Sequence, residues 1–269
     1  MKIRRIKVLL AKGWCKVVCF VSFSLLSLVC NHASAQKAGD MISGVAGVKI
    51  DTVLMSIDEA IEELERIPGY GMVFDDEASF VNTKFENGYG YVDLGLSVKW
   101  AMCNVGAERP EEYGDYYAWG EVETKESYEP NNYKFVNGGS PVNDKNTLDI
   151  ENDVAHKEWG GKWRMPSREE FDELIQNCTW TWTTQKGVNG FLVTSNKPGY
   201  TDRSIFLPAA GLRSLSELRL SGNIGFYWTT TPSEHFAESA CFLYITPGFK
   251  SLYESAARNQ AHTVRPVCP

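Results

Sequence analysis

The chain has 269 residues, of which 43% are hydrophobic and 23% are charged, and its formal net charge is −7. This length and composition are those of a globular protein with a sizeable core, and they exclude a disordered polyelectrolyte and a bundle of membrane helices. A nucleic-acid-binding protein would usually carry a basic face, so the acidic balance argues against a nucleic-acid partner.

The first 35 residues have the features of a secretory signal peptide. Residues 1–16 carry six basic side chains and no acidic one, residues 17–30 are almost wholly apolar, and Ala33-Ser34-Ala35 has the small-residue pattern of a cleavage site. The apolar run is shorter than a membrane-spanning helix requires. We therefore expect cleavage after Ala35 and export to the periplasm, the cell surface or the medium, in a form that does not span the membrane.

Lipidation of Cys30 is the alternative to cleavage after Ala35. A lipoprotein site requires a small residue just before the cysteine, and Val29 stands there. Cleavage after Ala35 is therefore the favoured processing, and N-terminal sequencing of the exported protein distinguishes the two.

Four cysteines remain after residue 35. An even number of cysteines in an exported chain predicts disulfides, and four of them allow three connectivities, which the sequence leaves open. A metal or redox site is the weaker alternative because the spacing contains no C-x-x-C pair. The disulfide candidates are Cys103, Cys178, Cys241 and Cys268.

Residues 36–90 form an acidic segment in which one helix is predicted. Ser56 and Glu59 have the spacing of a capping box, apolar residues follow at helical intervals, and Pro68-Gly69 ends the pattern. A segment of this length with one helix cannot bury a core of its own. We expect an appendage packed on the main domain, with a separate interaction module as the alternative.

Residues 91–269 are predicted to form an α+β domain with few helices, long irregular loops and a twisted, mostly antiparallel sheet. Strands are expected at residues 91–94 and 96–101, irregular loop at 105–147, and one strong helix that Ser167 caps and Glu170 completes as a capping box. Alternating and aromatic-rich segments predict the later strands, at residues 179–184, 190–194, 204–207, 226–230, 241–245 and 263–267.

Acidic side chains gather at the start of the Ser167 helix. A carboxylate cluster can serve acid–base catalysis or bind a cation, but carboxylates in the first turns of a helix more often complement its positive end. We favour the second interpretation for Glu169, Glu170, Asp172 and Glu173.

Several segments together resemble the Fibrobacter succinogenes major paralogous domain. They occur in the family's order over roughly residues 91–269, and they are Asp93–Ala101, Cys103–Ala107, Glu111–Glu121, Asp153–Ala155, Trp159–Ser167, Phe206–Gly211, Tyr227–Thr231 and Val264–Cys268. The resemblance implies a C-type-lectin-like fold related to the formylglycine-generating (sulfatase-modifying) proteins. It also implies an exported bacterial protein, often at the cell surface, in a family without an agreed activity.

Two properties of related folds find little support in the residues. A formylglycine-type oxidase needs two cysteines close together to bind copper. Cys241 and Cys268 are far apart in sequence. If the fold brought them together, a disulfide would be a simpler outcome than a copper site. Glu129-Pro130-Asn131 has the letters of a lectin calcium motif but precedes the Ser167 helix, and further ligands at calcium spacing are missing. We interpret this tripeptide as a turn and expect no cofactor or metal.

In lectin-like proteins the last strands and loops form a binding face, which corresponds here to residues 225–259. Aromatic rings with cationic and amide neighbours can stack on sugars or anchor a protein. Trp228 and Phe242 are expected in the core. The expected contact residues are Phe249, Lys250, Tyr253, Arg258 and Asn259, of which Phe249, Tyr253 and Arg258 stand in loop-like sequence between strands.

These observations predict an exported, non-catalytic binding or structural surface protein that recognises a glycan or a protein through its C-terminal loops. One alternative is a redox enzyme of the formylglycine-generating type. The other is a structural fimbrial or surface component, for which the acidic residues 51–86 would be the docking part.

Overall fold

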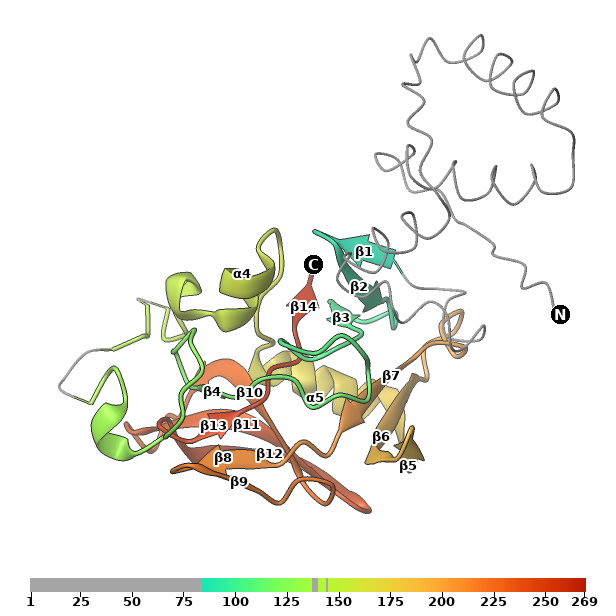
Figure 1. The fold of residues 1–269 in the computed structure, drawn as a ribbon. Coiled ribbons are helices and arrows are strands. Elements are labelled where there is room, and N and C mark those ends of the chain that lie inside the picture. The colour runs from blue at the N-terminus through green and yellow to red at the C-terminus, as the bar shows by residue number, and fades with distance from the viewer. Residues whose placement is uncertain (1–83, 137–139, 144) are drawn as a thin grey trace, which may run out of the picture. The chain divides into compact units, whose positions relative to one another are not determined.

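The computed structural model describes residues 84–136, 140–143 and 145–269. The predicted signal peptide and the predicted helix that Ser56 would cap lie outside these residues. Within them the fold is α+β and rich in antiparallel strands, as the sequence predicts (Figure 1). No helix in this described part is long and apolar enough to cross a membrane.

The two ends of the described chain meet in one antiparallel sheet. Its order is β1 (Lys84–Glu86), β2 (Tyr89–Val92), β3 (Lys99–Ala101) and β14 (Val267–Cys268), as Figure 1 shows. This sheet therefore begins at Lys84, earlier than the predicted domain start at residue 91.

The predicted strand 96–101 is shorter than expected. Asp93 accepts a hydrogen bond from the backbone N–H of Gly95 at 2.9 Å, and Gly95 has a φ of 72°. A Cβ at position 95 would also lie 2.6 Å from the Tyr200 ring, so this turn requires glycine. Residues 95–98 consequently form a turn, and the strand starts at Lys99.

The helices are short and lie at defined places. In the described residues two are α-helical, α4 (Val154–Trp159) and α5 (Arg168–Asn177), and two are 3₁₀ turns, η2 (Pro130–Asn132) and η3 (Ile150–Asn152). Both halves of the capping box predicted for Ser167 and Glu170 are present at the start of α5.

Helix α5 lies between two three-stranded sheets (Figure 1). One sheet contains β5 (Cys178–Gln185), β6 (Val188–Ser195) and β7 (Ser204–Pro208). The other contains β10 (Gly225–Pro232), β11 (Ser239–Thr246) and β12 (Phe249–Ala257). Phe171 and Leu174 on α5 are fully buried and belong to the same core cluster as side chains of both sheets.

A fourth sheet has the order β4 (Tyr117–Ala118), β13 (Ala261–His262), β8 (Leu212–Ser214) and β9 (Glu217–Arg219). The segment predicted as one strand at residues 263–267 is not continuous: Thr263 forms an isolated bridge with Tyr227, residues 264–266 lie outside any strand, and β14 begins at Val267. Its carbonyls accept hydrogen bonds from three separate parts of the chain: Thr263 accepts from Trp228, Val264 from Val105, and Pro266 from Ala101.

Arg265, inside that segment, links several parts of the core by hydrogen bonds. Its side chain is fully buried and donates hydrogen bonds to the carbonyls of Ala101, Met102 and Phe206 and to Oδ1 of Asn104. Burial lowers the pKa of the guanidinium, but these acceptors replace the water that it loses. Arg265 is thereby a structural centre that joins the two halves of the described chain.

Candidate functional site

The exposed aromatic residues that the sequence predicts for binding lie on β12. Phe249 is 48% exposed and Tyr253 is 43% exposed. The expectation that they sit in a loop is wrong, since both belong to a regular strand. The turn before them is only Pro247-Gly248, with a positive φ of 76° at Gly248, and Thr246 pairs directly with Phe249.

Ring contacts connect these two residues to the core. The Tyr253 ring lies 5.9 Å from the rings of both Phe242 and Tyr244, and the Phe249 ring lies 6.3 Å from Tyr244. Phe242 is buried, as expected. We call Phe242, Tyr244, Phe249 and Tyr253 the aromatic stripe: its inner rings hold its outer rings in place, so the exposed surface is preorganised.

The polar residues expected beside these aromatics serve other contacts. Lys250 projects to the opposite face of β12, where its ammonium lies 5.6 Å from the Trp180 ring. The Arg258 guanidinium lies 4.5 Å from the Trp119 ring, and its Nε donates to the Ser239 carbonyl at 3.0 Å.

Asn259 is likewise engaged, because its Nδ2 donates to the Tyr128 carbonyl at 2.9 Å. Arg258 and Asn259 are therefore half-buried groups that fasten the loop after β12 to distant parts of the chain. Of the five expected contact residues, only Phe249 and Tyr253 share the exposed face.

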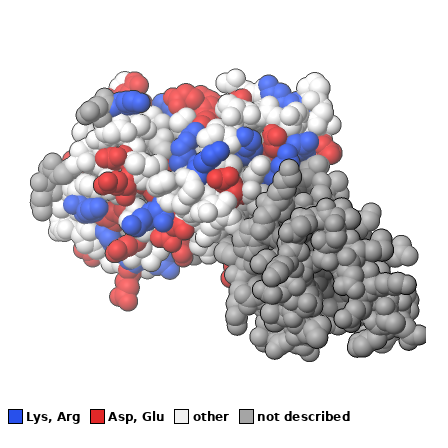
Figure 2. Space-filling view, turned by 90° about the horizontal axis from the view of Figure 1, so that it is seen from above, with Lys and Arg blue, Asp and Glu red and all other residues white. Residues whose placement is uncertain are grey.

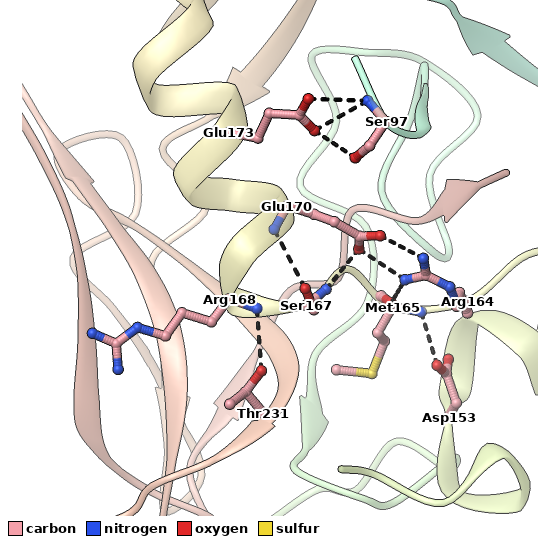
Figure 3. A network of polar contacts seen from close by, with 9 residues as sticks. All are labelled: Ser97, Asp153, Arg164, Met165, Ser167, Arg168, Glu170, Glu173 and Thr231. Atoms are coloured by element: carbon pink, nitrogen blue, oxygen red, sulfur yellow. Dashed lines mark hydrogen bonds and ion pairs between the residues drawn. The ribbon is translucent and has the colours of Figure 1, made fainter. Parts of the chain in front are cut away.

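A second group of polar residues converges at the start of α5 (Figure 3), and we call it the polar junction. Arg164 holds both oxygens of Glu170, with 2.8 Å from Nη1 to Oε2, and the Ser167 N–H donates to the same Oε2 at 2.8 Å. The carboxylate is thus saturated with donors, which favours the interpretation that it complements the helix start over acid–base catalysis.

Glu173 and Asp153 complete the polar junction. Glu173 accepts from the Ser97 N–H at 3.1 Å, which ties the turn before β3 to α5. Asp153 caps α4 by accepting from the N–H of His156 and also accepts from the N–H of Met165 at 2.8 Å. Burial raises the pKa of Asp153 to about 6, against the effect of these bonds. An acid with such a pKa could transfer protons, but this one is buried and bonded to the backbone.

The four cysteines correct the disulfide prediction. All of them are buried, they lie in different parts of the fold, and no disulfide joins any two of them. Burial raises the pKa of Cys103 to about 12 and those of Cys178 and Cys268 to about 11. It also raises the pKa of Cys241. These thiols stay protonated at neutral pH, and a protonated thiol is a poor nucleophile and metal ligand.

Sequence reasoning missed His262, which lies against the inner aromatic residues. Its ring stacks on Trp228 at 3.8 Å and lies 5.3 Å from Phe242. The side chain is fully buried, and neither ring nitrogen has a hydrogen-bond partner in the described part of the chain. No local signal marks this residue, because its surroundings come from strands distant in sequence.

Metal and surface charge complete the description. Residues 130–132 form the 3₁₀ turn η2, in agreement with the turn interpretation of Glu129-Pro130-Asn131. In the described ranges no group of three His, Cys, Asp or Glu side chains could hold a metal ion. Figure 2 shows basic and acidic side chains interspersed on the visible face of this part.

Comparison with known proteins gives no relative for this chain, since no family model, curated protein or solved structure matches it.

Proposed function

We propose that this protein is an exported, non-catalytic binding protein that contacts its ligand through Phe249 and Tyr253. The observation that carries the proposal is the aromatic stripe, whose outer rings are exposed while its inner rings are packed in the core. Large rigid side chains held open to solvent lose little conformational entropy on binding, and they suit the apolar face of a sugar ring or an apolar protein patch.

The resemblance to the major paralogous domain family and its C-type-lectin-like fold belongs to the same proposal. Antiparallel sheets with few helices and long loops fit such a fold. The position of the aromatic stripe on the last long strands fits the expected binding face. Export rests on the sequence of the first 35 residues.

The raised pKa values of the thiols support a binding protein over the redox alternative. A formylglycine-type oxidase needs a reactive thiolate, whereas burial favours the neutral thiol at Cys103, Cys178 and Cys268. Titration with a thiol reagent should label these residues slowly in the native protein and rapidly after denaturation. Rapid native labelling of two cysteines, together with copper binding, would favour the enzyme.

The direct test is a glycan and protein array probed with the wild-type protein and with Tyr253→Ala and Phe249→Ala variants. A hit that both variants weaken supports the aromatic stripe as the contact surface. Ser255→Ala is the matched control, because Ser255 is also exposed on β12. Hits that neither aromatic variant changes would overturn the proposed contact surface.

A further inference from the structure

Strand β12 is the longest strand of its sheet and lies at its edge. Among the described strands it pairs with β11 alone, in the order β10-β11-β12. An edge strand of nine residues presents main-chain N–H and C=O groups that can pair with another strand. Natural proteins usually protect such an edge from pairing with another strand. The side chains on β12 therefore indicate which second strand could pair with it.

The hairpin geometry tells which residues of β12 face the free side. Thr246 and Phe249 close the two-residue turn, so they form a hydrogen-bonded pair, and the pairs then alternate along the ladder. Lys250, paired with Ile245, and Leu252, paired with Leu243, stand at the non-hydrogen-bonded positions. Their N–H and C=O groups therefore point away from β11, toward the free edge.

The charges on either side of Leu252 would match those of a second copy of β12 that is related to the first by a two-fold rotation. Lys250 precedes Leu252 by two residues and Glu254 follows it by two, so all three project to the same face of the strand. An antiparallel copy of β12 centred on Leu252 would place Lys250 opposite Glu254 of that copy, and Glu254 opposite its Lys250. On the other face each Tyr253 would lie opposite a Ser251.

We propose that β12 pairs edge to edge with β12 of a second copy of this chain, antiparallel and centred on Leu252. The two sheets become one six-stranded sheet around a two-fold axis, the closed symmetry most common in homodimers. Opposite charges directly across two strands stabilise the pairing, whereas like charges would oppose it.

Charge also selects the register. A shift of the centre to Ser251 or Tyr253 moves the pairing by two residues and would leave both Lys250 and Glu254 without an oppositely charged neighbour directly across the interface. Glu254 already lies 3.9 Å from Nη1 of Arg168 and 3.5 Å from Nε2 of His235. These contacts hold its carboxylate on the face where Lys250 of the second copy arrives.

The pairing goes beyond the proposed function and leaves its surface open. Rings of the aromatic stripe project from the sheet, whereas the new strand joins in the plane of the sheet. Phe249 and Tyr253 of the two copies would line one continuous face, so a ligand with repeated units could be bound by both copies together.

The test is sedimentation velocity of the purified protein over a concentration series up to about 1 mM, a range suited to a small interface. Lys250→Glu places two carboxylates opposite each other, and Glu254→Lys places two ammonium groups opposite each other. Each variant alone should weaken dimerisation about tenfold or more, because two cross-strand attractions become repulsions. An equimolar mixture of the two variants restores both attractions and should dimerise as the wild type does.

Lys157→Glu is the control for the change in net charge, because Lys157 is exposed on α4 and should leave dimerisation unchanged. Thermal melting of each variant establishes that it is folded. A wild-type protein that stays monomeric throughout the series would overturn the proposal, as would single variants that dimerise normally or a mixture that does not. Tyr253→Ala separates the two proposals: it should remove ligand binding and keep the dimer.

Discussion

The two ends of one aromatic face, on the sheet formed by β10, β11 and β12, have opposite surroundings. At one end Trp228 and Phe242 pack against the buried ring of His262. At the other end Phe249 and Tyr253 project into solvent. Side chains alternate between the two faces of the sheet on all three strands, so the strand pattern does not decide which aromatic residues become core.

The two ends differ in whether another part of the chain packs over the aromatic rings. Strand β13, which carries His262, lies against the inner end because the chain after β12 turns back and pairs with β4 and β8. Trp228 also donates a hydrogen bond from Nε1 to the Tyr117 carbonyl on β4 at 2.8 Å. The buried end therefore depends on three elements distant in sequence, and the exposed end depends on β11 and β12.

The largest effect is expected at the buried end, for Trp228→Ala. The variant leaves a cavity beside His262 and removes the donor of the Tyr117 carbonyl, so we expect a loss of about 3–5 kcal/mol in the free energy of unfolding. Urea denaturation followed by circular dichroism measures this loss. A loss below about 1 kcal/mol would mean that the inner end is not part of the stabilising core.

His262 gives the buried end a dependence on pH. Burial lowers the pKa of His262 from 6.5 to about 3, so below pH 6.5 the unfolded chain binds a proton that the folded chain does not. The stability that the neutral His262 ring contributes is fully present above pH 6.5 and is lost as the pH falls toward 3. At about pH 4.5 the free energy of unfolding should be about 2–3 kcal/mol lower than above pH 6.5, since each pKa unit corresponds to about 1.4 kcal/mol.

His262→Phe tests that account, because phenylalanine keeps the ring contacts and removes the titrating group. The difference in unfolding free energy between variant and wild type should be small at pH 7 and should favour the variant increasingly below pH 6.5. Taking this difference cancels the pH dependence that other titrating groups contribute to stability. Among them is Asp153, whose raised pKa changes stability with pH in the direction opposite to that of His262. Parallel pH profiles for the two proteins would contradict the assignment.

The fold was predictable from sequence where local patterns determine it. The capping box of Ser167 and Glu170 is contained within one helical turn, and the alternation of Thr179–Thr184 falls within β5. The split of residues 263–267 could not be predicted, because the carbonyls of Thr263, Val264 and Pro266 accept hydrogen bonds from three separate parts of the chain. A sequence pattern describes which faces a strand has, but not what pairs with each carbonyl.

The candidate site shows the same limit. Exposure of Phe249 and Tyr253 was predicted correctly, although a two-residue turn places them in a strand and not in a loop. The engagement of Asn259 leaves no local signal, because its partner Tyr128 lies 131 positions earlier in the chain. The same holds for Arg258, whose neighbour Trp119 is also remote in sequence. The four cysteines were expected to pair from their even number, which carries no information on their positions in the fold.

A polar contact of intermediate burial should have an effect between those of the two aromatic ends. Glu173→Ala removes the acceptor that holds the Ser97 N–H and hydroxyl, so we expect a loss of about 1 kcal/mol in the free energy of unfolding. Asp172→Ala is the matched control, as an exposed carboxylate on the same helix. Equal losses in the two variants would mean that helix charge, and not the Ser97 contact, is what Glu173 contributes.

The smallest effect on stability is expected at the exposed end, for Phe249→Ala and Tyr253→Ala. Each removes a ring that already faces solvent, so the change in unfolding free energy should stay within about 0.5 kcal/mol. The same rings are the proposed anchors for a ligand, and losing a good anchor costs about 2 kcal/mol or more in binding free energy. Trp228→Ala should behave in the opposite way, with a large loss of stability. A titration of the array ligand, set beside urea denaturation of the same variants, separates the two quantities. A stability loss at Tyr253 as large as that at Trp228 would place this ring in the core, and the two ends of the face would then no longer differ.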